Sequence, residues 1–154
     1  KGRIGSTTAA GAPYGFVHAG GVHMATISAF RSYPNKWGTP RDPLLLRFDH
    51  NGKVLSTRWL AQTDKSSERP LLAKYGQEFL VAWDNSDPKS RDRTVVPQAI
   101  LSVVDKNGKP VTAPRQTTAP MDYLSALTVF PNGDVGWAQV SYKSSTIEVV
   151  RVRR

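Results

Sequence analysis

Short apolar segments separated by polar turns run through the chain, and the pattern is clearest in its middle third. Four segments there are expected to be strands: 70–75, 78–83, 98–104 and 109–116. The first three are rich in apolar or aromatic residues, and all four are bounded by the Gly, Asn, Asp and Pro residues that usually flank strands. The residues Asp105–Gly108 predict a tight hairpin turn, and 84–97 predicts a loop. Four strands in series predict an antiparallel meander.

Helical patterning is nearly absent from this sequence. No stretch of ten or more residues keeps a 3.6-residue apolar period free of Gly and Pro. The sequence therefore predicts an all-β protein.

A constant displacement along the chain relates two of its segments. The run Asp49–Lys53 (Asp-His-Asn-Gly-Lys) recurs as Asp105–Lys109 (Asp-Lys-Asn-Gly-Lys). The same displacement aligns an apolar strand in each copy: His23 with Phe79, Met24 with Leu80, Ala25 with Val81 and Ile27 with Trp83. A third, imperfect copy follows, in which Val135–Gln139 matches the same strand. One displacement that aligns both a strand and a turn indicates an internal repeat.

The repeat divides the chain into units at about 14–69, 70–123 and 124–154, with 1–13 as a closing or linking segment. A four-stranded meander that recurs at this spacing is typical of a β-propeller, in which each sheet, or blade, buries both faces against its neighbours. The chain is therefore expected to be a single propeller-like segment of about three four-stranded blades. A stacked solenoid is the alternative repeat architecture.

The second unit carries a more specific sequence pattern. Residues Pro70–Asp84 read P-L-L-A-K-Y-G-Q-E-F-L-V-A-W-D, and Asp105–Gly108 follow as D-K-N-G. This resembles a repeat of bacterial exported propeller proteins, P-x-[VIL]-A-x-x-G-x-x-[FY]-L-V-x-W-x-D, followed by [DN]-x-[DN]-G, although here Asp84 follows Trp83 directly. The other copies depart from it, with Ile27 and Gln139 in place of the tryptophan. The resemblance implies a fold and an extracellular or periplasmic location, and no particular activity.

The third copy reaches only the position of a third strand, at Ser145–Arg153. Three blades are fewer than the four to eight that normally close a ring. We therefore expect the chain to be part of a larger ring, completed by another protein chain, either a second cleaved chain or a second copy in a homodimer. Residues 1–8, which align with the end of a fourth strand, could complete the last blade. The alternative is an irregular sheet sandwich that closes by itself.

Composition adds an expectation about partners. The chain has 154 residues with 21 Lys or Arg and 12 Asp or Glu, a net charge of +9. This excess favours an acidic partner, such as an anionic polymer or polysaccharide, a nucleic acid, a lipid headgroup or an acidic protein surface. The charges are spread along the chain, so they could equally solvate exposed strands. No apolar run approaches the roughly 20 residues of a membrane-spanning helix, so no transmembrane segment is expected.

Two polar segments, 31–42 and 85–94, are longer than a blade requires and carry several cations. Loops on a rigid scaffold commonly carry binding, and interleaved cations and aromatic rings suit anionic polymers or the rings of sugars and bases. The candidate ligand-binding residues are Tyr33, Lys36, Trp37, Arg41, Lys89, Arg91 and Arg93. The alternatives are solvated loops or contacts with other blades.

Motifs for catalysis and metal binding are absent from the sequence. The three histidines lack the spacing of metal ligands, and no nucleophile elbow, phosphate-binding loop or dinucleotide glycine pattern occurs. Asp49 and Asp105 are explained as turn residues that bond their own backbone. Asp84, Asp87 and Asp92 could bind a cation or assist hydrolysis, or could form surface ion pairs. We therefore expect no metal site and no cofactor, and the sequence names no catalytic residue.

Most of the remaining aromatic residues are expected in the core. Phe79, Trp83, Phe130 and Trp137 lie on predicted strands at packing positions, and His23 aligns with Phe79. The preferred function is that of a non-catalytic propeller segment that binds an anionic or carbohydrate-like ligand or a partner chain. Enzymatic activity stays open, because the chain could instead be part of a propeller enzyme, a hydrolase or lyase, with an active site shared with another chain.

Overall fold

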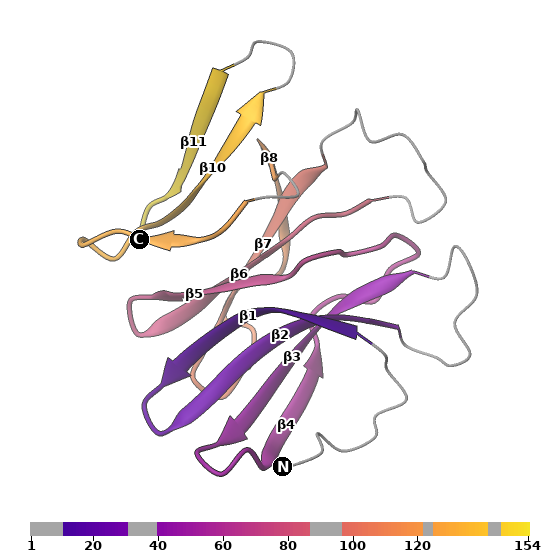
Figure 1. Cartoon of the computed structure of the whole chain (residues 1–154), viewed down its shortest axis with the longest axis vertical. Helices are drawn as coiled ribbons and strands as arrows, with labels where there is room; N and C mark the ends of the chain where they lie inside the picture. Colours follow the sequence, from indigo (N-terminus) through magenta and orange to yellow (C-terminus); the bar gives the residue numbers. More distant parts are fainter. Residues whose placement is uncertain (1–10, 31–39, 87–96, 122–124, 142–145) are drawn as a thin grey trace.

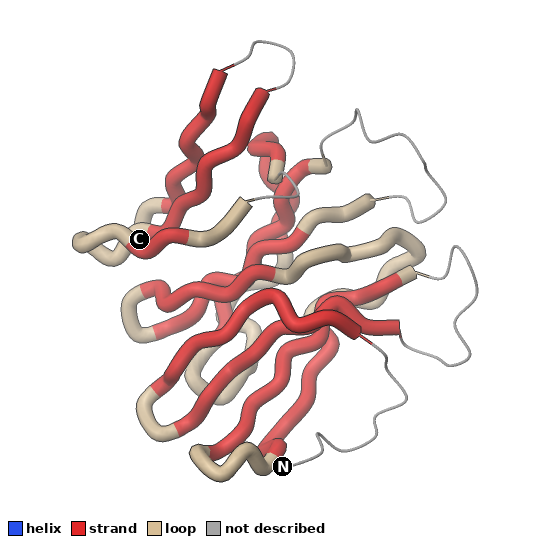
Figure 2. Tube along the Cα trace, viewed as in Figure 1, coloured by secondary structure: helices blue, strands red, loops and turns tan. Residues whose placement is uncertain are grey.

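A computed structural model gives the fold of the chain and describes residues 11–30, 40–86, 97–121, 125–141 and 146–154. Within these residues the only regular elements are β-strands, which form three antiparallel sheets (Figure 2). The expectation of an all-β protein is confirmed for this part of the chain.

Each sheet is formed by strands that are consecutive in the sequence. The first sheet contains β1 (Gly11–Ala19), β2 (Val22–Phe30), β3 (Arg41–Asp49) and β4 (Val54–Trp59). The second sheet contains β5 (Leu71–Tyr75), β6 (Glu78–Trp83), β7 (Gln98–Val104) and β8 (Arg115–Pro120). The third sheet contains β9 (Thr128–Val129), β10 (Val135–Ser141) and β11 (Thr146–Val152).

The second sheet lies between the first and the third, with the sheets packed face to face in sequence order (Figure 1). Between the first and second sheets the core includes Met24, Leu45, Phe79 and Trp83. Between the second and third sheets it includes Leu80, Ala82, Val135 and Trp137. Of the four aromatic residues expected in the core, Phe79, Trp83 and Trp137 are buried, and Phe130 is half-buried.

The predicted turns of the first two sheets form as expected. The Asp49 carboxylate accepts hydrogen bonds from the backbone N–H groups of Asn51 and Lys53, both at 2.9 Å. Asp105 does the same for Asn107 and Lys109, both at 2.8 Å. These side chains stabilise the turns locally, which explains both carboxylates without a catalytic role.

The prediction for the last strand of the second sheet was wrong in position. A strand was expected at 109–116, but β8 begins at Arg115. Between the turn and β8 the chain makes only a single bridge, from Val104 to Pro110, and the N–H groups of Val111 and Thr112 both point to the carbonyl of Val103. Prolines at 110 and 114 cannot donate to a ladder, so regular pairing starts only after them.

Among the described residues, no other sheet packs on the outer face of the first sheet or on the outer face of the third sheet. On the first sheet this face carries Phe16, which is 62% exposed, beside Phe48 of β3. On the third sheet it carries Ile147 and Val149 of β11, which are 73% and 67% exposed. Apolar side chains are therefore exposed at both ends of the stack.

Candidate functional site

The connection between the first and second sheets organises one end of both sheets. The backbones of Ser66 and Ser86 exchange two hydrogen bonds of 2.8 Å, and the N–H of Ser67 donates to the carbonyl of Arg41 at 2.6 Å. Arg41 lies near the end of the predicted binding loop 31–42, and Ser86 lies near the start of the predicted loop 85–94. Residues 66–67 thereby hold the bases of both loop segments on one hydrogen-bonded support.

A buried ion pair lies beside this support. Arg69 Nη2 is 2.7 Å from Asp84 Oδ2, and the Asp84 side chain is 2% exposed. Burial raises the pKa of Asp84 from 3.8 to about 6, although the Arg69 guanidinium opposes the shift. Arg69 also has a positive φ of 54°, a backbone conformation that is uncommon for a residue other than glycine. From the sequence, Asp84 was considered as a cation ligand or a hydrolytic residue. In the structure its carboxylate forms a buried ion pair with Arg69.

Further polar side chains are buried around the same connection. Asp42 is fully buried and its Oδ1 accepts a hydrogen bond of 3.1 Å from the N–H of Thr63. Ser28 donates to the carbonyl of Ser67 at 3.2 Å. Within the described residues, Oδ1 of Asp84 and Oγ of Ser67 are buried without a hydrogen-bond partner. Buried polar groups of this kind are concentrated at sites that bind ligands or ions as well as at structural junctions.

Of the seven predicted ligand-binding residues, only Arg41 falls within the described part of the chain. Its guanidinium carbon lies 4.7 Å from the centre of the Phe30 ring, a cation–π contact that joins the end of β2 to the start of β3. The other six lie outside the described residues: Tyr33, Lys36, Trp37, Lys89, Arg91 and Arg93. The same holds for Asp87 and Asp92.

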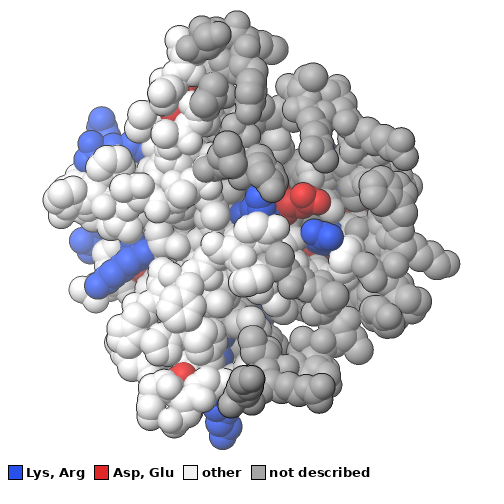
Figure 3. All heavy atoms as spheres, in the orientation of Figure 1, with Lys and Arg blue, Asp and Glu red and all other residues white. Residues whose placement is uncertain are grey.

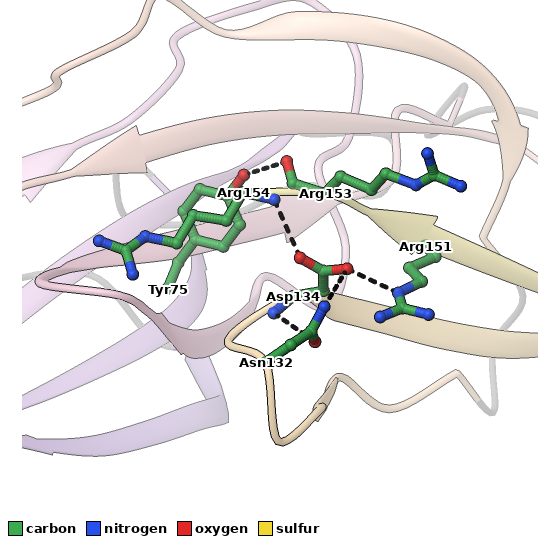
Figure 4. Close-up of polar contacts among 6 residues, drawn as sticks. All are labelled: Tyr75, Asn132, Asp134, Arg151, Arg153 and Arg154. Carbon is green, nitrogen blue, oxygen red and sulfur yellow. Dashed lines mark hydrogen bonds and ion pairs between the residues drawn. The ribbon is translucent and has the colours of Figure 1, made fainter.

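The opposite end of the second and third sheets carries a second polar group (Figure 4). Asp134 accepts hydrogen bonds from the N–H of Arg154 at 3.1 Å, from Asn132 at 2.9 Å and from Arg151 at 2.7 Å. These donors, the Arg154 N–H foremost, lower the pKa of Asp134 below 3.8. The Tyr75 hydroxyl donates to the carbonyl of Arg153. The contacts of Arg151, Arg153 and Arg154 fasten the end of β11 to β5 and to the β9–β10 turn, and the Asn132 contact stabilises that turn from within, so the group has a structural role.

A third group consists of aromatic and histidine rings at the hairpin end of the outer face of the first sheet, the face on which Ala29, Leu44 and Leu46 are buried farther along β2 and β3. His18 and His23 lie directly opposite each other in the β1–β2 hairpin, with their Nδ1 atoms 3.5 Å apart. The His23 ring also stacks on Phe16 and on Phe48, which agrees with the expectation that His23 packs. Spacing in the sequence did not single out this histidine pair. The feature of the sequence that could have identified the pair is the Gly20-Gly21 dipeptide midway between the two histidines. A two-residue turn at this dipeptide places them opposite each other.

Figure 3 shows one face of the molecule, and the Lys and Arg side chains of the described residues do not form a dense patch on it. Lys and Arg lie in small separate groups there, and some of them neighbour an Asp or Glu. For the cations drawn in colour on this face, the distribution agrees with the spread of cations along the sequence.

These observations define an all-β protein built from consecutive antiparallel sheets that pack face to face. Neither models of known protein families nor curated protein sequences give a match to this chain. Across the residues that the structure describes, no helix has the length and hydrophobicity needed to cross a membrane. Proposals about function therefore rest on the contacts described above.

Proposed function

We propose that the chain is a non-catalytic segment of a β-propeller that binds an anionic or carbohydrate-like ligand at the loop end of its first two sheets. The observation that carries the proposal is the shared support of the two loop segments. Residues 66–67 connect by backbone hydrogen bonds to both Arg41 and Ser86. Two loops held on one rigid base can present their side chains to the same ligand.

The way the sheets pack supports the propeller. Met24 and Leu80 occupy equivalent positions in the repeat, and each faces the next sheet along the chain. Phe79 and Trp83 face the preceding sheet, as does Val135, which is the repeat equivalent of Phe79. The second unit therefore uses one face for the preceding sheet and the other for the following one, and the equivalent residues of the first and third units face the same ways, as expected for propeller blades.

Exposed apolar side chains at the two ends of the stack support the proposal of a partner. Phe16 on one end face and Ile147 and Val149 on the other are large apolar side chains that remain accessible to solvent. Such positions are covered by neighbouring sheets at the two internal interfaces. Another protein chain that completes the ring, either a second copy or a different chain, would cover them in the same way.

The chemical class of the proposed ligand is inferred from the surroundings of Arg41. Its guanidinium is held against the Phe30 ring and its backbone is fixed by Ser66 and Ser67, so little freedom would be lost on binding an anion. A guanidinium and a ring at a loop base suit a sulfate, carboxylate or phosphate group, or the face of a sugar ring.

The proposal is tested by measuring binding of sulfated dextran and of neutral dextran to the purified chain at two salt concentrations. Arg41→Ala is expected to weaken binding of the sulfated polymer about five-fold, because one charge-assisted contact of about 1 kcal/mol is lost. Arg58→Ala removes a cation of the same type from an exposed position on β4 and should have little effect.

The triple variant Trp37→Ala, Arg91→Ala and Arg93→Ala is expected to weaken binding further, by about ten-fold or more, with an unchanged circular dichroism spectrum. Binding that is equally strong in wild type, Arg41→Ala and the triple variant would contradict a ligand site at the loop end.

A second candidate function is part of a propeller enzyme, a hydrolase or lyase, that shares its active site with another chain. The observation in its favour is the buried carboxyl of Asp84, whose pKa of about 6 suits proton transfer near neutral pH. Turnover of a polysaccharide by the assembled protein, with loss of activity in Asp84→Asn and normal folding, would favour this candidate over simple binding.

A further inference from the structure

The β1–β2 hairpin places two imidazole rings side by side. Gly20 and Gly21 form its two-residue turn with φ angles of 49° and 89°, so both residues adopt the left-handed conformation that such a turn requires. In a two-residue hairpin, the strand residues that flank the turn exchange hydrogen bonds. The next pair outward, here His18 and His23, is then a non-hydrogen-bonded pair, in which facing side chains are closest.

The separation of the two rings matches that of two ligands on one metal ion. The Nδ1 atoms of His18 and His23 are 3.5 Å apart. A tetrahedral zinc ion with Zn–N distances of about 2.0–2.1 Å holds two nitrogens roughly 3.3–3.4 Å from each other. A metal ion could therefore join the two Nδ1 atoms with only small side-chain adjustments.

The surroundings orient one ring and leave the pair accessible. The His23 ring lies 5.4 Å from the Phe16 ring and 5.6 Å from the Phe48 ring, with interplanar angles of 23° and 25°. Stacking against these rings restricts the rotation of His23 before any ligand binds. His18 and Phe16 are exposed, so an ion in solution can reach the pair.

Neighbouring ionisable groups do not complete a larger cluster. Asp49, which pairs with Val22 next to His23, uses Oδ1 to bind the N–H groups of Asn51 and Lys53. Throughout the described ranges, no group of three or more His, Cys, Asp or Glu residues is arranged to hold a metal. The histidine pair would supply two ligands and leave the remaining positions to water or to a donor from another molecule.

We propose that His18 and His23 form a surface site that chelates a divalent transition-metal ion of the zinc type through their Nδ1 atoms. Neutral imidazole suits zinc, copper and nickel, whereas calcium and magnesium prefer oxygen ligands. The site lies at the hairpin end of the outer face of the first sheet and is separate from the loop end where the ligand site is proposed.

The test is titration of the purified chain with zinc chloride by calorimetry at pH 7.5 in a buffer that does not bind metals. The expected result is one zinc ion per chain. Loss even of an outer-shell partner typically weakens metal binding about 10–100-fold, so His18→Gln should lower the zinc affinity by at least about ten-fold. His50→Gln is the matched control, because His50 is exposed in the β3–β4 turn, and it should bind zinc like the wild type.

Comparison with the second unit of the repeat suggests a substitution of His23 that should preserve the fold. Phe79 occupies the position equivalent to His23, so His23→Phe should retain the packing of the face while removing a ligand. His23→Phe is expected to lose zinc affinity to the same extent as His18→Gln, with an unchanged circular dichroism spectrum.

The liganding atoms are identified by nitrogen-15 NMR of the imidazole rings, in which zinc should shift the Nδ1 signals of His18 and His23 and leave His50 unchanged. Zinc affinity that changes less than about two-fold in both His18→Gln and His23→Phe, or falls equally in His50→Gln, would overturn the proposal. Calcium chloride in place of zinc chloride should produce no binding heat, and equal binding of calcium would also overturn it.

Discussion

The second and third sheets follow the same repeat but differ in what covers their faces. In the second sheet, every residue of β6 from Phe79 to Trp83 is buried, because the first sheet covers one face and the third sheet the other. In the third sheet, Val150 and Val152 of β11 pack against the second sheet, whereas Ile147 and Val149 are exposed. In the described part of the chain, the third sheet thus has apolar residues on both faces but a neighbouring sheet on only one.

This difference shows for which sheets the described contacts cover both of the faces that carry apolar residues. A strand with apolar residues on both faces is typical of a sheet buried on both sides. The second sheet fulfils that pattern within the chain. The exposed Ile147 and Val149 of the third sheet and the exposed Phe16 of the first agree with the proposal that a further protein surface covers these residues.

The largest expected effect comes from breaking the covered interface. Trp83 is fully buried between the first two sheets, so Trp83→Ala should lower the free energy of unfolding by about 3–5 kcal/mol through loss of apolar contact and formation of a cavity. Urea denaturation followed by circular dichroism measures this change. A loss below about 1 kcal/mol would mean that the interface between these sheets is not well packed.

A smaller effect on the free energy of unfolding is expected from a change of pH. It distinguishes the carboxyl group of Asp84, which follows β6, from that of Asp134, which precedes β10. Because burial raises the pKa of Asp84 from 3.8 to about 6, the folded chain retains a proton that the unfolded chain releases in this interval. The free energy of unfolding should therefore fall as pH rises from about 4 to 6, by roughly 3 kcal/mol. Urea titrations across this range, with Asp84→Asn as the variant that loses the dependence, measure the effect.

Asp134 provides the matched control for this pH dependence. Its pKa is lowered by the hydrogen bonds from Arg154, Asn132 and Arg151, so its contribution to stability is lost only as pH falls below about 3.8. Asp134→Asn should therefore keep the response between pH 4 and 6. If Asp84→Asn kept the same slope in that interval, the buried carboxyl would not be its source.

The smallest expected change in stability concerns the open face of the third sheet. Ile147→Ser and Val149→Ser remove side chains that are largely exposed, so each should change the free energy of unfolding of the isolated chain by less than about 0.5 kcal/mol. Denaturation at low protein concentration checks this. A loss comparable to that of Trp83→Ala would show that these residues are already buried within a single chain.

Much of the fold could be predicted from the sequence because local signals agree with long-range packing. The segments 78–83 and 98–104 were predicted as strands and correspond to β6 and β7 without any change in their bounds. The Asp-x-Asn-Gly turns were predicted for the same reason, since the side-chain hydrogen bonds that stabilise them are local. The position of β8 was missed, because the prolines before it disrupt pairing without leaving a clear apolar pattern.

The candidate sites were harder to predict because their contacts join distant segments. The ion pair between Arg69 and Asp84 depends on how the connection between two sheets folds back over β6, which no spacing in the sequence specifies. The histidine pair depends on the register of the β1–β2 hairpin. Of the predicted ligand-binding residues, Arg41 is described and stacks on Phe30, and the role of all seven stays a prediction.

The central claim is that these sheets are blades of a larger ring, and the native mass of the purified protein tests it most directly. Light scattering coupled to gel filtration should give the mass of two copies or of this chain with a second one. Ile147→Lys combined with Val149→Lys should reduce that mass to a single chain, because charged side chains would disrupt the contact with the proposed partner at this face of the third sheet. A single-chain mass for the wild-type protein at micromolar concentration would contradict the claim and favour a sandwich of sheets that closes by itself.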